Sequence, residues 1–354
     1  MKILIENFKS IKKLEFELSK INILIGPSAS GKSNILEALA FSNLIRRIAE
    51  FEKGEIKIAE GEYAERDEWV KEFLKYLRIK IDDELSLRST FFGKSIRNGI
   101  IITLDDRAHK FEYEKNGFII NHPFYESISL REPVIQGNDA ENILEEDIPI
   151  RLYRGIRESK FYSDEYFLEF GEFGREVSYF LGMFEKKINT FLNEVSNLSL
   201  ISREEVPWRE PILWDTEIGI SYHFENLSDG LKKLLYLYLA VKSNEEYRPN
   251  LEKILLLEEP EVRVFPYYTN CIAELLLESL STGSKICFIL STHNNQFLEK
   301  FLMHIEEKGE RYLEDLKILY IERDAKKGTY IKQSYSGKEA VERVKGGEYL
   351  IKLI

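Results

Sequence analysis

The sequence is poor in cysteine, methionine and tryptophan, and it contains no long hydrophobic run. Its two cysteines, Cys271 and Cys287, stand in apolar surroundings and form no Cys-x-x-Cys pair, which excludes a metal or redox motif of that type. We expect both to be buried, reduced thiols. No stretch reaches the about 18 apolar residues of a membrane-spanning helix, and the amino-terminal stretch lacks a signal-peptide cleavage pattern. These absences predict a cytoplasmic protein with no membrane partner.

A surplus of basic residues is also missing. The 354 residues include 50 Lys and Arg against 61 Asp and Glu, a formal net charge of −11. Such a chain is not expected to coat nucleic acid or anionic membranes indiscriminately. Small basic groups do occur, and we interpret them as solvated faces, with contact to DNA as the alternative. They are Lys9, Lys12, Lys13, Arg46 and Arg47.

Hydrophobic periodicity predicts different architectures for the two ends of the chain. The amino-terminal part has the pattern of short strands at 2–8, 14–18 and 21–25, followed by a helix over 32–51. From about residue 218, strands and helices alternate, which predicts a mainly parallel sheet covered by helices. The helices and strands expected in this part are, in order, 231–243, 253–257, 267–281, 285–290, 296–307 and 316–321.

The segment between these two parts has a mixed character. It predicts a helix over 67–77, alternating strands within 99–120 joined by a turn at Asn116-Gly117, and a helix over 165–197. No heptad repeat extends over four turns, so no long coiled-coil arm is expected. The predicted division is a discontinuous α/β head and one inserted α+β and helical lobe, at residues 1–49 with 211–354 and at residues 50–210, respectively.

One segment, GPSASGKS, fits the phosphate-binding pattern G-x-x-x-x-G-K-[ST] between a predicted strand and a predicted helix. Glycines let the backbone N–H groups face the phosphates, and the start of the helix adds partial positive charge. Lys32 then reaches the β- and γ-phosphates, and the Ser33 hydroxyl ligates Mg²⁺. ATP and Mg²⁺ are the expected ligands, against the alternative of an ordinary glycine-rich turn. The residues expected to bind nucleotide are Gly26, Pro27, Ser28, Ala29, Ser30, Gly31, Lys32, Ser33 and Asn34.

Two adjacent glutamates follow the apolar strand 253–257. Like charges in contact disfavour ionisation unless a cation stands nearby. A strand parallel to the one before the phosphate loop ends beside that loop, so we expect Glu258 to hold Mg²⁺ directly or through water. Pro260 ends the strand, which leaves Glu259 to orient and deprotonate a water molecule that attacks the γ-phosphate. The alternative is a solvated acidic turn after a core strand.

Two further segments become candidate parts of the same site once the phosphate loop is identified. Ser228 and Gly230 precede an amphipathic helix and offer a second anion site, although alone they are an ordinary helix cap. His293 follows another apolar strand, and we predict that it senses the γ-phosphate, against the alternative of a structural hydrogen bond. The predicted catalytic groups are therefore Lys32, Glu259 and His293.

In this order, the four motifs resemble those of the ATP-binding-cassette (ABC) superfamily. The closer likeness is to its SMC/RecF-like branch and to the OLD-like ATPases (overcoming lysogenization defect). The segments that carry it are NFK, GPSASGKSNILEAL, LSDG, LLLEEPEVRVFP and STHNNQFL. The likeness covers about residues 1–42 and 220–325. It implies a P-loop NTPase fold, an ABC-type head whose mainly parallel sheet is flanked by helices, with an antiparallel β portion at the amino terminus.

The resemblance also implies that the head dimerises around two ATP molecules. Each site would combine residues of one subunit with two residues of the other, namely Lys32, Ser33, Glu258 and Glu259 with Ser228 and Gly230. Two features depart from the family pattern. Leu231 stands where many cassettes have Gln or Glu, and EVRVFP, after Pro260, lacks the histidines common in relatives.

What the resemblance implies for function is an ATPase whose ATP-driven homodimerisation acts as a switch in DNA repair, DNA maintenance or defence against mobile elements. A separately encoded effector protein is an expected partner, and DNA is a candidate partner. The toprim nuclease domain of many OLD-like relatives is not expected, because Asp315 and Asp324 are the only aspartates after His293. The alternative is a slow, nucleotide-gated module that recruits an effector with little turnover. An ABC transporter subunit fits the motifs less well.

Overall fold

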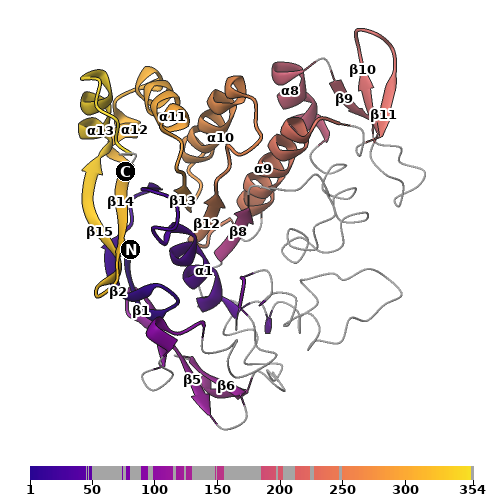
Figure 1. Ribbon diagram of the computed structural model, residues 1–354. Helices are drawn as coiled ribbons and strands as arrows, with labels where there is room; N and C mark the ends of the chain where they lie inside the picture. Colours follow the sequence, from indigo (N-terminus) through magenta and orange to yellow (C-terminus); the bar gives the residue numbers. More distant parts are fainter. Residues whose placement is uncertain are drawn as a thin grey trace, which may run out of the picture.

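A computed structural model gives the arrangement of the chain (Figure 1). It describes residues 1–44, 99–114, 117–122, 125–129, 150–154, 185–196, 198–201, 212–223, 227–246 and 249–351, with isolated positions between 46 and 94 and residue 148. Within these ranges, twelve strands form one mixed sheet in the order β7-β6-β5-β4-β1-β2-β15-β14-β3-β13-β12-β8. Three more strands, β9 (Leu198–Ile201), β10 (Ile212–Asp215) and β11 (Ser221–His223), form a small separate sheet.

One half of the large sheet is parallel and carries helices on both faces. Its strands are β14 (Leu316–Asp324), β3 (Ile21–Ile25), β13 (Ile286–Ser291), β12 (Lys253–Glu258) and β8 (Ile150–Arg154). Every residue of β3 and β12 is buried, because alternate side chains enter opposite cores. Ile23 packs in the core under the row of helices, and Leu24 packs in the other core with helix α1 (Lys32–Ser42).

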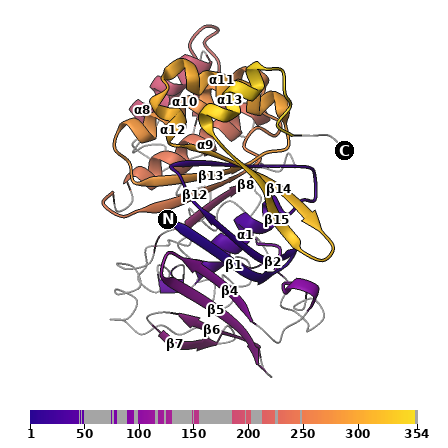
Figure 2. The same cartoon turned by 90° about the vertical axis from the view of Figure 1, so that its left-hand side faces the viewer.

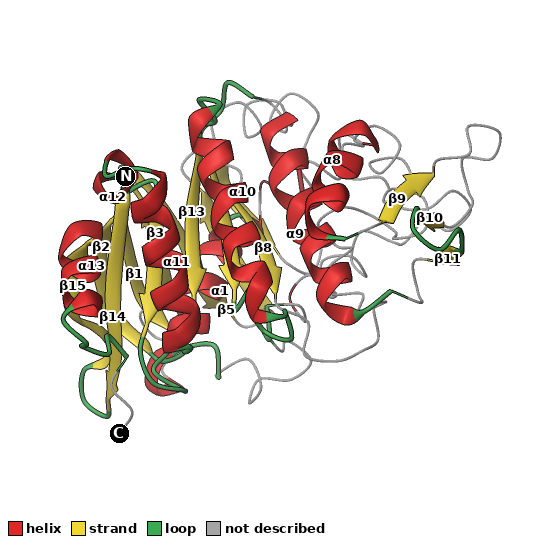
Figure 3. Ribbon diagram, turned by 90° about the horizontal axis from the view of Figure 1, so that it is seen from above, coloured by secondary structure: helices red, strands yellow, loops and turns green. Residues whose placement is uncertain are grey.

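The row of helices covers one face of this parallel half, and Figure 3 looks down on it. Apolar residues of each helix join the same core as alternate strand residues. The helices are α8 (Glu185–Val195), α9 (Asp229–Glu246), α10 (Thr269–Ser281), α11 (Asn295–Lys308), the short α12 (Arg311–Glu314) and α13 (Gly337–Lys345). Among the described helices, none is long and apolar enough to span a bilayer.

The other half of the sheet is antiparallel and curves away from the helices (Figure 2). Its strands are β1 (Lys2–Phe8), β2 (Ile11–Glu17), β4 (Ile100–Leu104), β5 (Arg107–Glu114), β6 (Gly117–His122), β7 (Tyr125–Ser129) and β15 (Gly328–Ser336). β14 joins the two halves, since it runs parallel to β3 and antiparallel to β15. The carboxyl-terminal hairpin β14–β15 therefore lies between the two segments β1–β2 and β3, which adjoin in sequence.

The structure confirms the predicted fold class, with a parallel sheet flanked by helices and an antiparallel portion beside it. The sheet as a whole is mixed, because the pattern analysis did not predict β15 and its pairing with β2. The first long helix α1 ends at Ser42, where the Asn43 N–H bonds back to Ala40 O, and helical residues resume at Leu44. Strands β5 and β6 pair antiparallel with Glu114 opposite Gly117, which confirms the two alternating strands expected there. The turn expected at Asn116-Gly117 stays a prediction, because Asn116 lies outside the described residues.

The predicted division into a head and an inserted lobe remains a prediction. The sheet is continuous across that division, because β4 pairs with β1 and β8 pairs with β12. Most of the helices expected at 67–77 and 165–197 lie outside the described residues.

The basic groups near the amino terminus differ in part from the solvated faces expected. Lys12 and Lys13 are exposed, but Lys9 makes an ion pair inside the fold and Arg46 is completely buried. The interpretation as solvated faces is therefore wrong for Lys9 and Arg46, and Arg47 lies outside the described residues. The cysteines form no disulfide and are partly buried.

Candidate functional site

The carboxyl ends of β3, β12 and β13 meet at one edge of the parallel half, and a cavity of about 680 Å³ opens there. The loop from β3 to α1 forms one wall of this cavity, with every residue from Ser28 to Asn34 in the lining. Glu259 and His293 line it from the segments after β12 and β13. Three predicted groups from distant parts of the sequence thus converge on one space.

The conformation of the loop depends on two glycines with positive φ. Gly26 has φ +142° and Gly31 has φ +102°, values that side chains rarely allow. A Cβ on Gly31 would stand 2.1 Å from Oγ1 of Thr329, and one on Gly26 would stand 2.2 Å from the carbonyl oxygen of Ile321. The hairpin β14–β15 therefore presses directly on the loop, and only glycine fits at these two points.

Lys32 lies over the loop at the start of α1. Its Nζ donates hydrogen bonds to the carbonyl oxygens of Gly26 (2.8 Å) and Pro27 (2.9 Å), and it is 3.4 Å from Oγ of Ser30. Burial lowers the pKa of Lys32, and the negative charges of Glu259 and Glu261 oppose that shift. This ammonium group and the start of α1 form a positive wall that suits a polyphosphate.

The two glutamates after β12 take separate positions. Glu258 is the last strand residue and is 5% exposed, with Oε2 3.7 Å from Nη2 of Arg78. Glu259 has φ +47°, which turns it out of the strand line, and its N–H donates to Ser291 O at 3.0 Å. Its Oε1 is 3.0 Å from Nδ1 of His293. The chain therefore separates a buried carboxylate from one that faces the cavity.

The donors present fit Mg²⁺ bound together with a nucleotide. Ser33 lines the cavity and offers a hydroxyl, whereas Glu258 is buried at the end of β12, is not among the lining residues, and offers a carboxylate. Both are oxygen ligands of the kind that Mg²⁺ prefers. Within the described ranges, no group of three His, Cys, Asp or Glu side chains could hold a metal alone. Phosphate oxygens would therefore have to complete the coordination, as in other phosphate-loop sites.

Ser228 and Gly230, at the start of α9, are not among the residues that line this cavity. Ser228 is exposed, and a Cβ on Gly230 would stand 3.4 Å from the carbonyl oxygen of Arg263. Nζ of Lys233, one turn further along α9, donates to the carbonyl oxygen of Val262. The start of α9 thus packs on the segment that follows Glu259 and adds no residue to the lining of the cavity in its own chain.

Several residues that the sequence did not single out contribute to this site. Arg78 and Arg323 line the cavity with positive charge, beside Arg263 from the segment EVRVFP, which the sequence had already marked as a departure from the family pattern. Glu261 and Thr292 form a buried contact behind it, with Oγ1 and Oε1 2.5 Å apart. Thr292 could have been suspected from its place beside His293, whereas Arg78 comes from a charged stretch that carries no motif.

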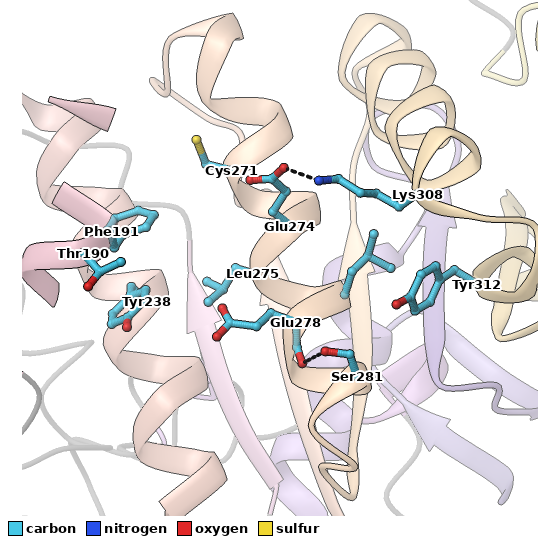
Figure 4. Close-up of a pocket in the computed structure, with 11 residues that line it drawn as sticks. Thr190, Phe191, Tyr238, Cys271, Glu274, Leu275, Glu278, Ser281, Lys308 and Tyr312 are labelled. Atoms are coloured by element: carbon cyan, nitrogen blue, oxygen red, sulfur yellow. Dashed lines mark hydrogen bonds and ion pairs between the residues drawn. The ribbon is translucent and has the colours of Figure 1, made fainter. Parts of the chain in front are cut away.

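A second cavity, of about 650 Å³, lies on the helical face (Figure 4). Phe191 of α8 stacks on Tyr238 of α9 with ring centroids 4.8 Å apart. Glu274 of α10 pairs with Lys308 of α11 at 2.8 Å. No described residue lines both cavities, so the phosphate loop belongs to the first alone.

Residues 21–299 match the protein-family model described as "AAA domain, putative AbiEii toxin, Type IV TA system". The matched range includes the loop, both glutamates and His293. The chain belongs to this family. None of the functionally curated proteins compared with the sequence matches it.

Solved structures place this AAA-domain chain beside the heads of SMC proteins. One is the SMC head bound to the C-winged helix domain of ScpA, at 15% identity and a TM-score of 0.52, covering 96% of this chain and 98% of that one. The SMC head domain from Thermotoga maritima is 14% identical, with a TM-score of 0.44 and coverage of 93% and 97%. The first match and the family show an ABC-like P-loop ATPase fold of the SMC/RecF kind.

Proposed function

We propose that this AAA-domain chain binds ATP with Mg²⁺ and hydrolyses it, and that two copies close around two ATP molecules as a switch. The observation that carries the proposal is the pairing of Glu259 Oε1 with His293 Nδ1 at 3.0 Å, within the cavity that the phosphate loop lines. A carboxylate and an imidazole held together opposite a phosphate loop suit the activation of water.

Each residue has a defined role in this proposal. The backbone N–H groups of Gly26 and of Ser28 to Asn34, together with the Lys32 ammonium, bind the phosphates. Ser33 and Glu258 would hold Mg²⁺, which would supply positive charge to the phosphates when bound. Glu259 accepts a proton from water as the water oxygen attacks the γ-phosphorus and ADP departs. His293 orients Glu259 and contacts the γ-phosphate.

Dimerisation is supported by where the start of α9 lies. Ser228 and Gly230 resemble a second phosphate-contacting segment, yet they do not line the cavity of their own chain. In a two-fold dimer, the same surface of each chain meets the other. The start of α9 would then cover the nucleotide of the partner copy.

The proposed setting is the cytoplasm, in DNA repair, DNA maintenance or defence against mobile elements, close to the OLD-like ATPases. The name of the family supports a defence role, since it refers to a toxin–antitoxin system. One similar SMC head is described in complex with the C-winged helix domain of ScpA. By analogy, we propose that a separately encoded effector protein binds the ATP-bound dimer, and that DNA is a second partner.

Two variants test the hydrolytic site. Lys32→Ala should lower nucleotide binding and hydrolysis, and Glu259→Gln should slow hydrolysis by at least about 100-fold while ATP still binds. Phosphate release and size-exclusion chromatography with ATP are the measurements, and Glu259→Gln should elute as a stable dimer. The exposed residues of α11 provide the controls Lys300→Ala and Glu299→Gln. Wild-type turnover in Lys32→Ala or Glu259→Gln would contradict the mechanism.

A second candidate function is a nucleotide-gated module with little turnover. Leu231, which departs from the family pattern, is 5% exposed and packs in the helical core. It therefore offers no polar group to a nucleotide of the partner copy. Turnover that stays negligible with DNA and effector present, together with ATP-dependent dimerisation, would favour this function.

A further inference from the structure

Behind the nucleotide cavity, a buried hydrogen bond ties together the two segments that carry Glu259 and His293. Glu261 and Thr292 are almost completely buried, at 9% and 0% exposure, and Oγ1 of Thr292 lies 2.5 Å from Oε1 of Glu261. Oγ1 of Thr292 also accepts the N–H of Asn294 at 3.0 Å. A hydroxyl carries one proton, so the proton of Thr292 is directed to the Glu261 carboxylate.

This contact lies directly beside the proposed catalytic pair. Thr292 precedes His293 in sequence, and Glu261 follows Glu259 by two residues. The backbone of Thr292 is itself fixed, because its N–H donates to the carbonyl oxygen of Leu24 in β3 at 3.0 Å. A displacement of Glu261 from Thr292 would therefore move Glu259 relative to His293.

Burial of the Glu261 carboxyl group removes it from water, which is unfavourable for the free energy of folding. Burial raises the pKa of Glu261 to about 7, and the negative charge of Glu259 adds to this, while the Thr292 hydroxyl and Lys233 oppose it. Among the described residues, no group hydrogen-bonds the second oxygen, Oε2. A well-packed apolar residue would avoid this desolvation, so stability alone does not account for the carboxyl.

We propose that the Thr292–Glu261 hydrogen bond is a positioning contact that sets the Glu259 carboxylate against the His293 imidazole. The inference rests on the proposed hydrolytic function. It assigns Thr292 and Glu261 no contact with the nucleotide. They act through the two loop segments, and the effect appears at the pair Glu259–His293, which lines the cavity.

The test removes the hydroxyl without changing the size of the side chain. Thr292→Val should lower kcat about ten- to a hundredfold, because a small displacement of the reacting groups raises the activation barrier. The dissociation constant for a fluorescent ATP analogue should stay within about twofold. Thr292→Ser, which restores the hydroxyl, should return kcat close to the wild-type value. Thr282→Val is the control, because it makes the same substitution at a threonine outside the cavity lining, whose hydroxyl donates to the backbone carbonyl of Ser279 at 2.9 Å.

A second measurement does not depend on hydrolysis. The chain has five histidines, so the ring signal of His293 can be assigned in an NMR spectrum by its loss in His293→Gln. That signal should move in Thr292→Val, return in Thr292→Ser and stay in place in Thr282→Val. An unmoved signal, or an unchanged kcat in Thr292→Val, would overturn the positioning role. A wild-type chain without ATPase activity would refute the hydrolytic function, while the His293 signal would still decide the contact.

Discussion

At the scale of single residues, the behaviour of Glu261 with pH is the most direct physical consequence of the site. Its folded-state pKa of about 7 exceeds the usual value of 4.5, so between these two values the folded chain binds more protons than the unfolded chain. The stability contributed at this position is therefore full below pH 4.5 and is lost as pH rises towards 7.

Glu261→Gln should remove this dependence. Measured by urea denaturation, the free energy of unfolding of the variant should gain roughly 2–3 kcal/mol relative to wild type between pH 5 and pH 8. The exposed control Glu299→Gln should show no such change. Parallel pH profiles for Glu261→Gln and wild type would mean that the folded-state carboxyl titrates near its ordinary pH.

Which individual residues matter could be predicted only where a motif marks them. The pattern E-E-P separated the expected roles of Glu258 and Glu259, and the structure gives the reason, a left-handed φ of +47° at Glu259. No motif assigns a role to Thr292 or Arg78, although the place of Thr292 beside His293 is a hint. Their importance comes from tertiary contacts with residues more than 30 positions away, and a single sequence contains no record of those contacts.

At the scale of elements, the phosphate loop is held by the hairpin β14–β15. Gly31 lies so close to Thr329 that any side chain would displace one of them. Gly31→Ala should therefore weaken nucleotide binding by at least about tenfold, measured by titration with a fluorescent analogue. Gly283 has a comparable positive φ of +77° but open space around it, so Gly283→Ala should cost only about 1–2 kcal/mol of stability and leave nucleotide binding intact.

The outcome of this comparison separates two explanations of the glycine. Equal nucleotide affinity in Gly31→Ala and Gly283→Ala would show that the loop tolerates a displaced β15, and that backbone conformation alone selects glycine.

The strand β15 itself was absent from the predicted pattern. Its exposed and buried residues do not alternate regularly, because it pairs fully with β14 and at only one residue with β2.

At the scale of the whole molecule, the proposed sharing of sites between two chains predicts that two inactive variants can complement each other. Lys32→Ala removes the phosphate-loop lysine, and Ser228→Arg blocks the start of α9. In a mixed dimer, one site combines the intact Lys32 of one chain with the intact Ser228 of the other. An equal mixture should regain about a quarter of wild-type hydrolysis, since half of the dimers are mixed and each has one intact site of two.

Each variant alone should be inactive, and a mixture of Lys32→Ala with Glu259→Gln is the matched control. Both of those changes fall on the cavity of one chain, so the intact Glu259 and the intact Lys32 stay in different sites and no activity returns. Activity that also stays absent in the first mixture would rule out sites shared between chains. The sequence predicted the motifs for such sharing, but only the fold places Ser228 outside the cavity of its own chain.

The position of β3 in the sheet has a consequence for the synthesis of the chain. The strand before the phosphate loop is made among the first 25 residues, yet its two neighbours, β13 and β14, begin at residues 286 and 316. The loop also needs Thr329 from β15. The phosphate loop of an emerging chain is therefore incomplete until nearly all of these segments have left the ribosome. Until then, the apolar strand β3 lacks its neighbours β13 and β14. If the chain binds ATP as proposed, ATP would stabilise the finished protein but would give no protection to the nascent one.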